Sequence, residues 1–224
     1  MESMLRKPVE AALFDMDGLL LDTEAIYVEA MQEAARTLGH RELPLDFCHS
    51  TAGVPGPERN RMIEAHYGEG FSIDAFREQF AVHARRRMDA GIPVKPGVVE
   101  LLDFLASRGL PLGVATSARR PTAENHLGKA GLLGRFAAIA TRDDVERTKP
   151  HPDVYLEAAR RLGVAPERCL AFEDSNVGLE AAHAAGAMAF MVPDLLQPLP
   201  ESRKRSVDVF PDLHAALRVL RQHL

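Results

Sequence analysis

The sequence is poor in several features that would mark particular classes of protein. It has only two cysteines, and Cys48 and Cys169 lack the spacing of a metal site. Cys169 lies in an apolar strand-like run, so we expect a buried free thiol there, consistent with a reducing, cytoplasmic location. No apolar run is long enough to span a membrane, and residues 1–7 lack the apolar core of a signal peptide. Neither a membrane protein nor a secreted protein is expected.

An excess of positive charge is also missing. The 224 residues include 27 basic and 32 acidic side chains, for a formal net charge of −5, and the basic clusters are short. A nucleic-acid partner is therefore not expected. The hydrophobic share of 46% is enough for a sizeable core. The length fits one domain of about 200 residues or a core with a smaller insert.

Two parts of the chain differ in their predicted secondary structure. An apolar strand is predicted at 9–15, followed by a helix that begins near Thr23 and ends near Gly39. No convincing strand follows before residue 90, which predicts an inserted all-α module. We expect this cap domain at 23–90, and a discontinuous core domain at 1–22 and 91–224.

From residue 91 onward, apolar strands alternate with helices that glycine or proline bounds. This pattern predicts an α/β fold with a doubly wound parallel sheet. The predicted strands are 110–115, 136–140, 168–172 and 187–192, with a short last strand at 206–210.

Polar side chains gather where the predicted strands end. Ligands of a doubly wound sheet bind beyond the carboxyl ends of the strands, so residues there are candidates for a shared site. In chain order these candidates are Asp15 and Asp17, Thr116 and Ser117, Lys149, and Glu173 and Asp174. Acids, a hydroxyl and a lysine on one rim predict a site for a divalent cation and an anionic substrate.

Each motif also has an ordinary structural explanation when taken alone. The Asp-x-Asp-Gly at 15–18 could be a turn, Thr116 or the acids at 173–174 could cap a helix, and Lys149 could be a surface residue. Their joint occurrence at strand ends, in this order, favours a catalytic site.

The four motifs resemble those of the haloacid dehalogenase (HAD) superfamily in residues, order and spacing. The segment from Asp15 to Glu24 further resembles the subgroup with a helical cap, which includes sugar-phosphate phosphatases and β-phosphoglucomutases. The resemblance implies a HAD-like Rossmannoid core. The cap resembles the family in layout more than in residues.

This resemblance implies a Mg²⁺-dependent phosphatase that forms an aspartyl-phosphate. Asp15 would be the nucleophile, and Asp17 would protonate the leaving oxygen and then take a proton from water. The metal would be held by Asp15, Asp174 and the backbone carbonyl of Asp17, with Glu173 acting on its water shell.

The resemblance also implies how the phosphate is held. Lys149 would place a positive charge between the nucleophile and the transferring group, and Thr116 would donate a hydrogen bond to a phosphate oxygen. Backbone amides near Asp17, Gly18 and Ser117 would complete the phosphate cradle.

The expected substrate is a small phosphorylated metabolite, either a sugar or a polyol phosphate. The alternative is a β-phosphoglucomutase-like mutase, but the histidine typical of mutases after the first motif is replaced by Tyr27. The cap loop typical of mutases reads Gly53-Val54-Pro55-Gly56, with Arg59 displaced from the usual arginine position. Tyr27 and Arg59 are thus candidates for substrate specificity. A catalytically silent scaffold is a third possibility, and oligomeric state is not predicted.

Overall fold

The computed structural model describes residue 5 and residues 7–51, 54 and 56–224. The chain divides into two compact units. One unit, the core, comprises Met1–Asp22 and Pro93–Leu224, and the other, the cap, comprises Thr23–Ile92.

The core contains a six-stranded sheet in the order β3-β2-β1-β4-β5-β6, and all neighbouring strands are parallel. This confirms the predicted doubly wound sheet. The strands are β1 Ala11–Phe14, β2 Leu112–Ala115, β3 Ala138–Ala140, β4 Cys169–Glu173, β5 Met188–Met191 and β6 Asp208–Val209. Strands that follow one another in the chain are joined by segments that contain helical structure.

Most of the core helices begin or end close to a glycine or proline, as the sequence pattern predicted. They are α5 Val98–Ser107, α6 Arg120–Lys129, α7 Asp153–Leu162, α8 Asn176–Ala184, α9 Pro200–Arg205 and α10 Leu213–Leu220. The described residues of the core also form three 3-10 turns: η1 Leu133–Arg135, η2 Arg142–Asp144 and η3 Pro166–Arg168. Within the described residues, no helix combines the length and the apolar character needed to cross a membrane.

The two faces of the sheet are packed differently, because successive side chains of a strand point to opposite faces. On one face, Ala11 and Leu13 of β1 pack with the buried sides of α7 and α8. On the other face, aromatic rings stack across neighbouring strands. Their centroids lie 5.0 Å apart for Phe14 and Phe172, and 5.5 Å apart for Phe172 and Phe190. Both layers are shielded from water and fix the central strands that end at the polar rim.

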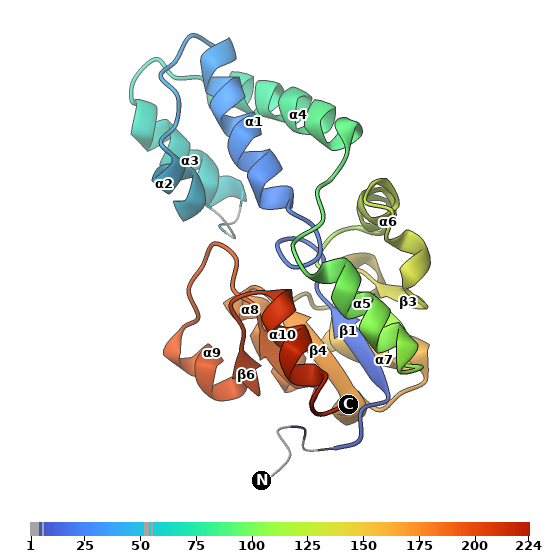
Figure 1. Cartoon of the computed structure of the whole chain (residues 1–224). Coiled ribbons are helices and arrows are strands. Elements are labelled where there is room, and N and C mark those ends of the chain that lie inside the picture. The colour runs from blue at the N-terminus through green and yellow to red at the C-terminus, as the bar shows by residue number, and fades with distance from the viewer. Residues whose placement is uncertain (1–4, 6, 52–53, 55) are drawn as a thin grey trace. The chain divides into compact units, whose positions relative to one another are not determined.

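The described residues of the cap form four helices and no strand. The helices are α1 Thr23–Thr37, α2 Leu45–Ser50, α3 Gly56–Tyr67 and α4 Ile73–Ala90. Helices α1 and α4 pack along one another (Figure 1). The cap has a small hydrophobic core of its own, formed by Val28, Met31, Ala34, Ala35, Leu43, Cys48, Ile63 and Phe76.

Two core segments mark where the chain leaves for the cap and returns. The backbone N–H of Asp22 donates to the carbonyl of Pro93 at 2.8 Å, and that of Lys95 donates to the carbonyl of Leu20 at 3.0 Å. Leu21 also forms a bridge with Val94. The two ends of the insertion are therefore tied together within the core by main-chain hydrogen bonds.

Candidate active site

Strand β1 delivers the first predicted carboxylate directly to the rim of the sheet. The N–H of Asp15 donates to the carbonyl of Phe172 at 3.0 Å, so the pairing with β4 continues one residue past the end of β1. The Asp15 side chain is only 11% exposed. The chain then turns at Gly18, which has a φ of 85°. A Cβ atom there would lie 2.4 Å from Asp174 Oδ2, so both the backbone angle and the close approach require glycine.

Three carboxylates converge at this rim. Oxygens of Asp15, Glu173 and Asp174 all lie within 4.8 Å of one another. Burial, with the Glu173 charge added, raises the pKa of Asp15 to about 7, although Lys149 acts in the opposite direction. Burial, with the charges of Asp15 and Glu173 added, raises the pKa of Asp174. Negative charge is thus concentrated away from water, and a bound cation would reduce the repulsion among the three carboxylates.

Lys149 provides positive charge at this cluster. Its ammonium group donates hydrogen bonds to Asp15 and, at 2.5 Å, to Glu173 Oε1. The side chain is only 6% exposed. Burial acts to lower the pKa of Lys149, but the charges of Asp15 and Glu173 outweigh it and raise that pKa above its usual range. Lys149 is therefore charged at neutral pH and lies directly against the predicted nucleophile.

Glu173 is the last residue of β4 and is fully buried. The hydroxyl of Tyr155, on α7, donates to Glu173 Oε1 at 2.6 Å, and Ser175 donates to Oε2 at 3.2 Å. The Lys149 ammonium also lies 5.1 Å from the centre of the Tyr155 ring. Tyr155 was not among the site residues predicted from the sequence. Nothing in the helical spacing shows that its hydroxyl meets an acid of β4.

The predicted hydroxyls follow β2, the strand beside β1. Val114 pairs with Phe14, so the ends of these two strands lie at the same level of the sheet. Thr116 is 1% exposed, and its Oγ1 accepts the N–H of Ala118 at 3.0 Å, while Ser117 is exposed. The sheet register thus brings both hydroxyl residues to the rim that carries Asp15.

Asp17 is separate from the carboxylate cluster. Its side chain is 34% exposed, and its carboxylate does not belong to the three-acid group found among the described residues. Oδ1 of Asp17 lies 3.9 Å from Nδ1 of His126, a residue that sequence reasoning missed. The spacing of Ala123, His126 and Leu127 on the buried face of α6 is a signal that could have drawn attention to this histidine.

A lysine and two acids lie beside the turn at Gly18. Lys95 Nζ is 2.5 Å from Asp194 Oδ1 and 3.7 Å from Asp22 Oδ1. Asp194 Oδ2 lies 3.6 Å from the position that a Cβ of Gly18 would take. Lys95 and Asp194 lie outside the four motifs, so neither was predicted from the sequence.

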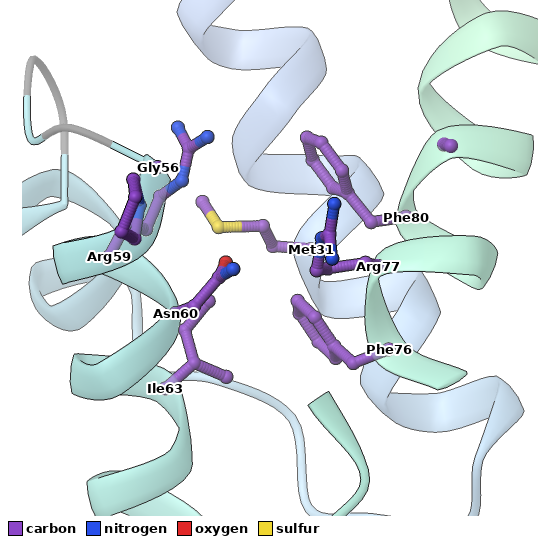
Figure 2. Close-up of a pocket in the computed structure, with 10 residues that line it drawn as sticks. Met31, Gly56, Arg59, Asn60, Ile63, Phe76, Arg77 and Phe80 are labelled. Carbon is purple, nitrogen blue, oxygen red and sulfur yellow. The ribbon is translucent and has the colours of Figure 1, made fainter. Parts of the chain in front are cut away.

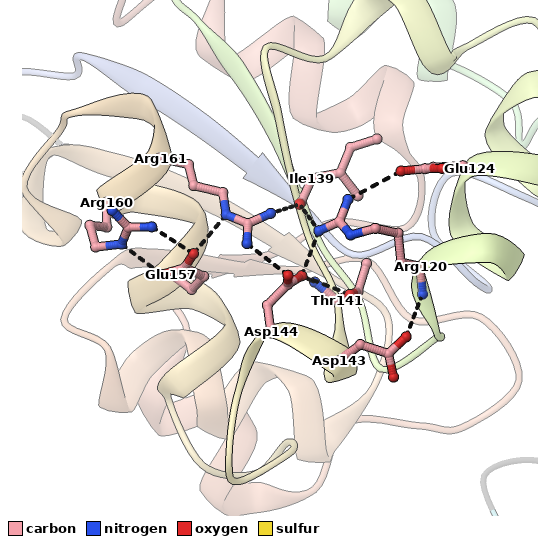
Figure 3. A network of polar contacts seen from close by, with 9 residues as sticks. All are labelled: Arg120, Glu124, Ile139, Thr141, Asp143, Asp144, Glu157, Arg160 and Arg161. Atoms are coloured by element: carbon pink, nitrogen blue, oxygen red, sulfur yellow. Dashed lines mark hydrogen bonds and ion pairs between the residues drawn. The ribbon is translucent and has the colours of Figure 1, made fainter.

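Helix α6 is fixed at its start by the polar network in Figure 3. The backbone N–H of Arg120 donates to Asp143 at 2.9 Å, and its guanidinium group donates to Asp144 at 2.6 Å. Asp144 also accepts from the N–H and hydroxyl of Thr141, and Arg161 of α7 lies 2.8 Å from it. The network joins α6 and α7 to the chain that follows β3. It therefore anchors the helix that carries His126.

The two specificity candidates belong to the cap. The ring of Tyr27 packs 5.9 Å from that of Phe80, and Arg59 lies on α3. Arg59 lines a pocket of about 530 Å³ within the cap, shown in Figure 2. The pocket is formed by Met31, Gly56, Pro57, Arg59, Asn60, Ile63, Phe76, Arg77, Phe80 and Ala81. Of the loop compared with mutases, Gly53 and Pro55 lie outside the described residues.

Comparisons with known proteins point to one family. The sequence pattern of haloacid dehalogenase-like hydrolases matches residues 12–192. A phosphorylated carbohydrates phosphatase of Thermotoga maritima is 34% identical over 178 residues, which cover 80% of this chain and 82% of the relative. Hexitol phosphatase B of Escherichia coli is 30% identical over 202 residues, or 84% of this chain and 85% of the relative.

A solved structure extends the likeness to three dimensions. A HAD family hydrolase from Deinococcus radiodurans, crystallised with bound phosphate and sodium, superposes with a TM-score of 0.83 at 28% identity. The match covers 96% of each chain. Both units of the present fold therefore have counterparts in a known hydrolase.

Proposed function

Since the chain belongs to the haloacid dehalogenase-like hydrolase family, we propose that it is a Mg²⁺-dependent phosphatase of a small phosphorylated metabolite, a sugar or polyol phosphate. The names of the two phosphatase relatives support this substrate class. The observation that carries the proposal is the contact of buried Lys149 with Asp15, beside Glu173 and Asp174.

The arrangement suits phosphoryl transfer to a carboxylate. Asp15 attacks phosphorus, and the bond to the leaving oxygen breaks as an aspartyl-phosphate forms. Lys149 stabilises negative charge on the transferring group, and Thr116 donates a hydrogen bond to one of its oxygens. Asp17 protonates the leaving oxygen and later takes a proton from the water that releases phosphate.

The acidic cluster fits a divalent cation. Three carboxylates within 4.8 Å of one another, two of them with raised pKa values, form an oxygen-rich donor set of the kind that Mg²⁺ prefers. Asp15, Asp174 and the carbonyl of Asp17 would hold the ion, with Glu173 beside its water shell. A bound Mg²⁺ would reduce the repulsion between the nucleophile and an anionic phosphate.

The test is phosphate release by the purified protein with Mg²⁺ across a panel of sugar, polyol and aryl phosphates. We expect turnover of at least one, and a loss of about 10⁴-fold or more in Asp15→Asn, because an amide cannot form the covalent intermediate. Failure to release phosphate from any panel member would contradict the proposal.

The same assay separates the proposal from a mutase. A mutase would isomerise a sugar phosphate, would depend on a bisphosphate activator and would release little phosphate. A protein unaffected by Asp15→Asn in any functional assay would instead be a silent scaffold.

A further inference from the structure

His126 is a polar residue on the buried face of a helix. Its side chain is 6% exposed, and the neighbouring face residues Ala123 and Leu127 are fully buried. Moving an imidazole from water into such surroundings is unfavourable unless its polar atoms find hydrogen-bond partners. Packing alone therefore does not account for a histidine at this position.

One ring nitrogen has no such partner within the part of the chain that the structure describes. His126 Nδ1 is buried and makes no hydrogen bond there. It lies 3.9 Å from Asp17 Oδ1, which is too far for a hydrogen bond but close enough for a side-chain rotation to form one. Buried polar groups without partners are rare in folded proteins, and a catalytic role is one recognised reason for them.

We propose that His126 is a positioning residue for the acid and base of the reaction. Its Nδ1–H donates to Oδ1 of Asp17 when substrate is bound, which fixes the carboxyl group and leaves Oδ2 to carry the transferable proton. The inference rests on the proposed phosphatase function, and it assigns a role to a residue outside the four motifs.

The protonation state of His126 does not change during the proposed reaction. Oδ2–H of Asp17 gives its proton to the leaving oxygen while the P–O bond breaks and the bond from Asp15 to phosphorus forms. Oδ2 then takes a proton from the attacking water, which restores the acid. Nδ1 keeps its hydrogen throughout, so the imidazole orients Asp17 and exchanges no proton with it.

This role predicts that only poor leaving groups need His126. An alkyl alkoxide must be protonated as it leaves, whereas a nitrophenolate departs as a stable anion. The ratio kcat/KM includes only the steps up to transfer of the phosphoryl group to Asp15. In His126→Leu we expect kcat/KM to fall about 10- to 100-fold for an alkyl phosphate, the range for loss of a hydrogen bond to a carboxyl group that becomes charged as it gives up its proton. For p-nitrophenyl phosphate it should change less than about threefold.

A second variant separates geometry from folding. In His126→Asn, the side-chain amide can place an N–H near the position of Nδ1, so alkyl phosphate turnover should recover in part. His183→Gln changes an exposed histidine of α8 and should leave both substrates unaffected. Unfolding curves of all variants report whether each is folded.

Several outcomes would overturn the inference. An equal loss on both substrates would mean general damage to the site, and no loss on either would mean that His126 does not position Asp17. A long-range ¹H–¹⁵N NMR spectrum that shows Nδ1 without hydrogen at neutral pH would also contradict it. These results differ from failure of the proposed function, in which the unaltered protein would release no phosphate.

Discussion

Glu173 shows at the scale of one residue how a buried charge is kept in place. The carboxylate is fully buried, yet it accepts hydrogen bonds from Lys149, Tyr155 and Ser175. Removing one donor takes away a hydrogen bond that water cannot readily replace. The resulting loss of unfolding free energy therefore exceeds the loss for an ordinary surface hydrogen bond.

Tyr155→Phe removes one of these donors and retains the ring beneath Lys149. We expect the free energy of unfolding to fall by about 1–3 kcal/mol, because the Glu173 carboxylate loses a hydrogen bond in a buried site. Urea unfolding followed by circular dichroism measures the change.

The matched control is Tyr67→Phe in the cap. The Tyr67 hydroxyl donates to the carbonyl of Arg41 at an exposed position, where water can replace it. A smaller loss is expected, below about 1 kcal/mol. If the free energy of unfolding fell equally in the two variants, the buried hydrogen bond at Glu173 would stabilise the fold no more than the exposed one does.

Residue identity and spacing were enough to find the four motifs, because strand ends in a parallel sheet share one edge. Tyr155 and His126 were missed for a common reason. Both lie within helices, and helical periodicity shows that a residue faces inward without showing which strand end it meets. Their roles depend on how α6 and α7 are placed on the sheet.

At the scale of elements, the carboxylate of Asp144 joins α6 and α7 through Arg120 and Arg161, and Glu157 of α7 in turn holds Arg161. Burial would raise the pKa of Asp144, but hydrogen bonds from Thr141 and Arg161 outweigh it and hold that pKa below its usual range. Hydrogen bonds from Arg160, and then from Arg161, lower the pKa of Glu157 to about 2. Both acids thus prefer to be ionised in the folded protein.

These shifts predict a loss of stability in acid. The folded-state pKa of Glu157 lies below the unfolded value of 4.5, so its contribution is fully present above pH 4.5 and is lost as pH falls toward about 2. The lowered pKa of Asp144 acts in the same direction. In Asp144→Asn and Glu157→Gln, the unfolding free energy should be lower at pH 7 and depend less on pH between 2 and 5.

The control for this prediction is Glu146→Gln, which changes an exposed acid in the same region of the chain. It should leave the acid profile of the unfolding free energy close to that of the unaltered protein. If the unfolding free energy of Asp144→Asn depended on pH as steeply as that of the unaltered protein, the network would not be the cause of the loss of stability in acid.

The strands were predictable from the sequence, and two short helices were not. Strands β1, β2 and β5 lie within predicted apolar runs and β4 extends one residue past its own, whereas the predicted strand at 136–140 is shortened to Ala138–Ala140. Helices α2 and α9 have six residues each and were missed, since so short a segment shows little more than one helical period. Their formation depends on packing and local capping.

For the whole molecule, the acidic cluster predicts that a divalent cation stabilises the fold. Mg²⁺ that binds the native state alone would add about 2.7 kcal/mol at 100 times its Kd, and so raise the unfolding temperature. Thermal unfolding with increasing Mg²⁺ measures this, and chelation by EDTA should abolish phosphate release.

The control is Asp174→Asn, which removes one carboxylate of the cluster. This variant should show a much smaller shift of the unfolding temperature with Mg²⁺. An equal shift in both proteins would place the cation effect elsewhere.

The central position of β1 has a consequence for biosynthesis. This strand leaves the ribosome before β2 and β4, yet it pairs with β2 at Leu112–Val114 and with β4 at Cys169–Phe172. At about 5–20 residues per second, the nascent chain must wait several seconds before either partner emerges. The apolar segment Ala11–Phe14 is exposed during that interval, while the cap can already fold. We expect ribosome-bound chains that stop before residue 112 to bind chaperones through this strand.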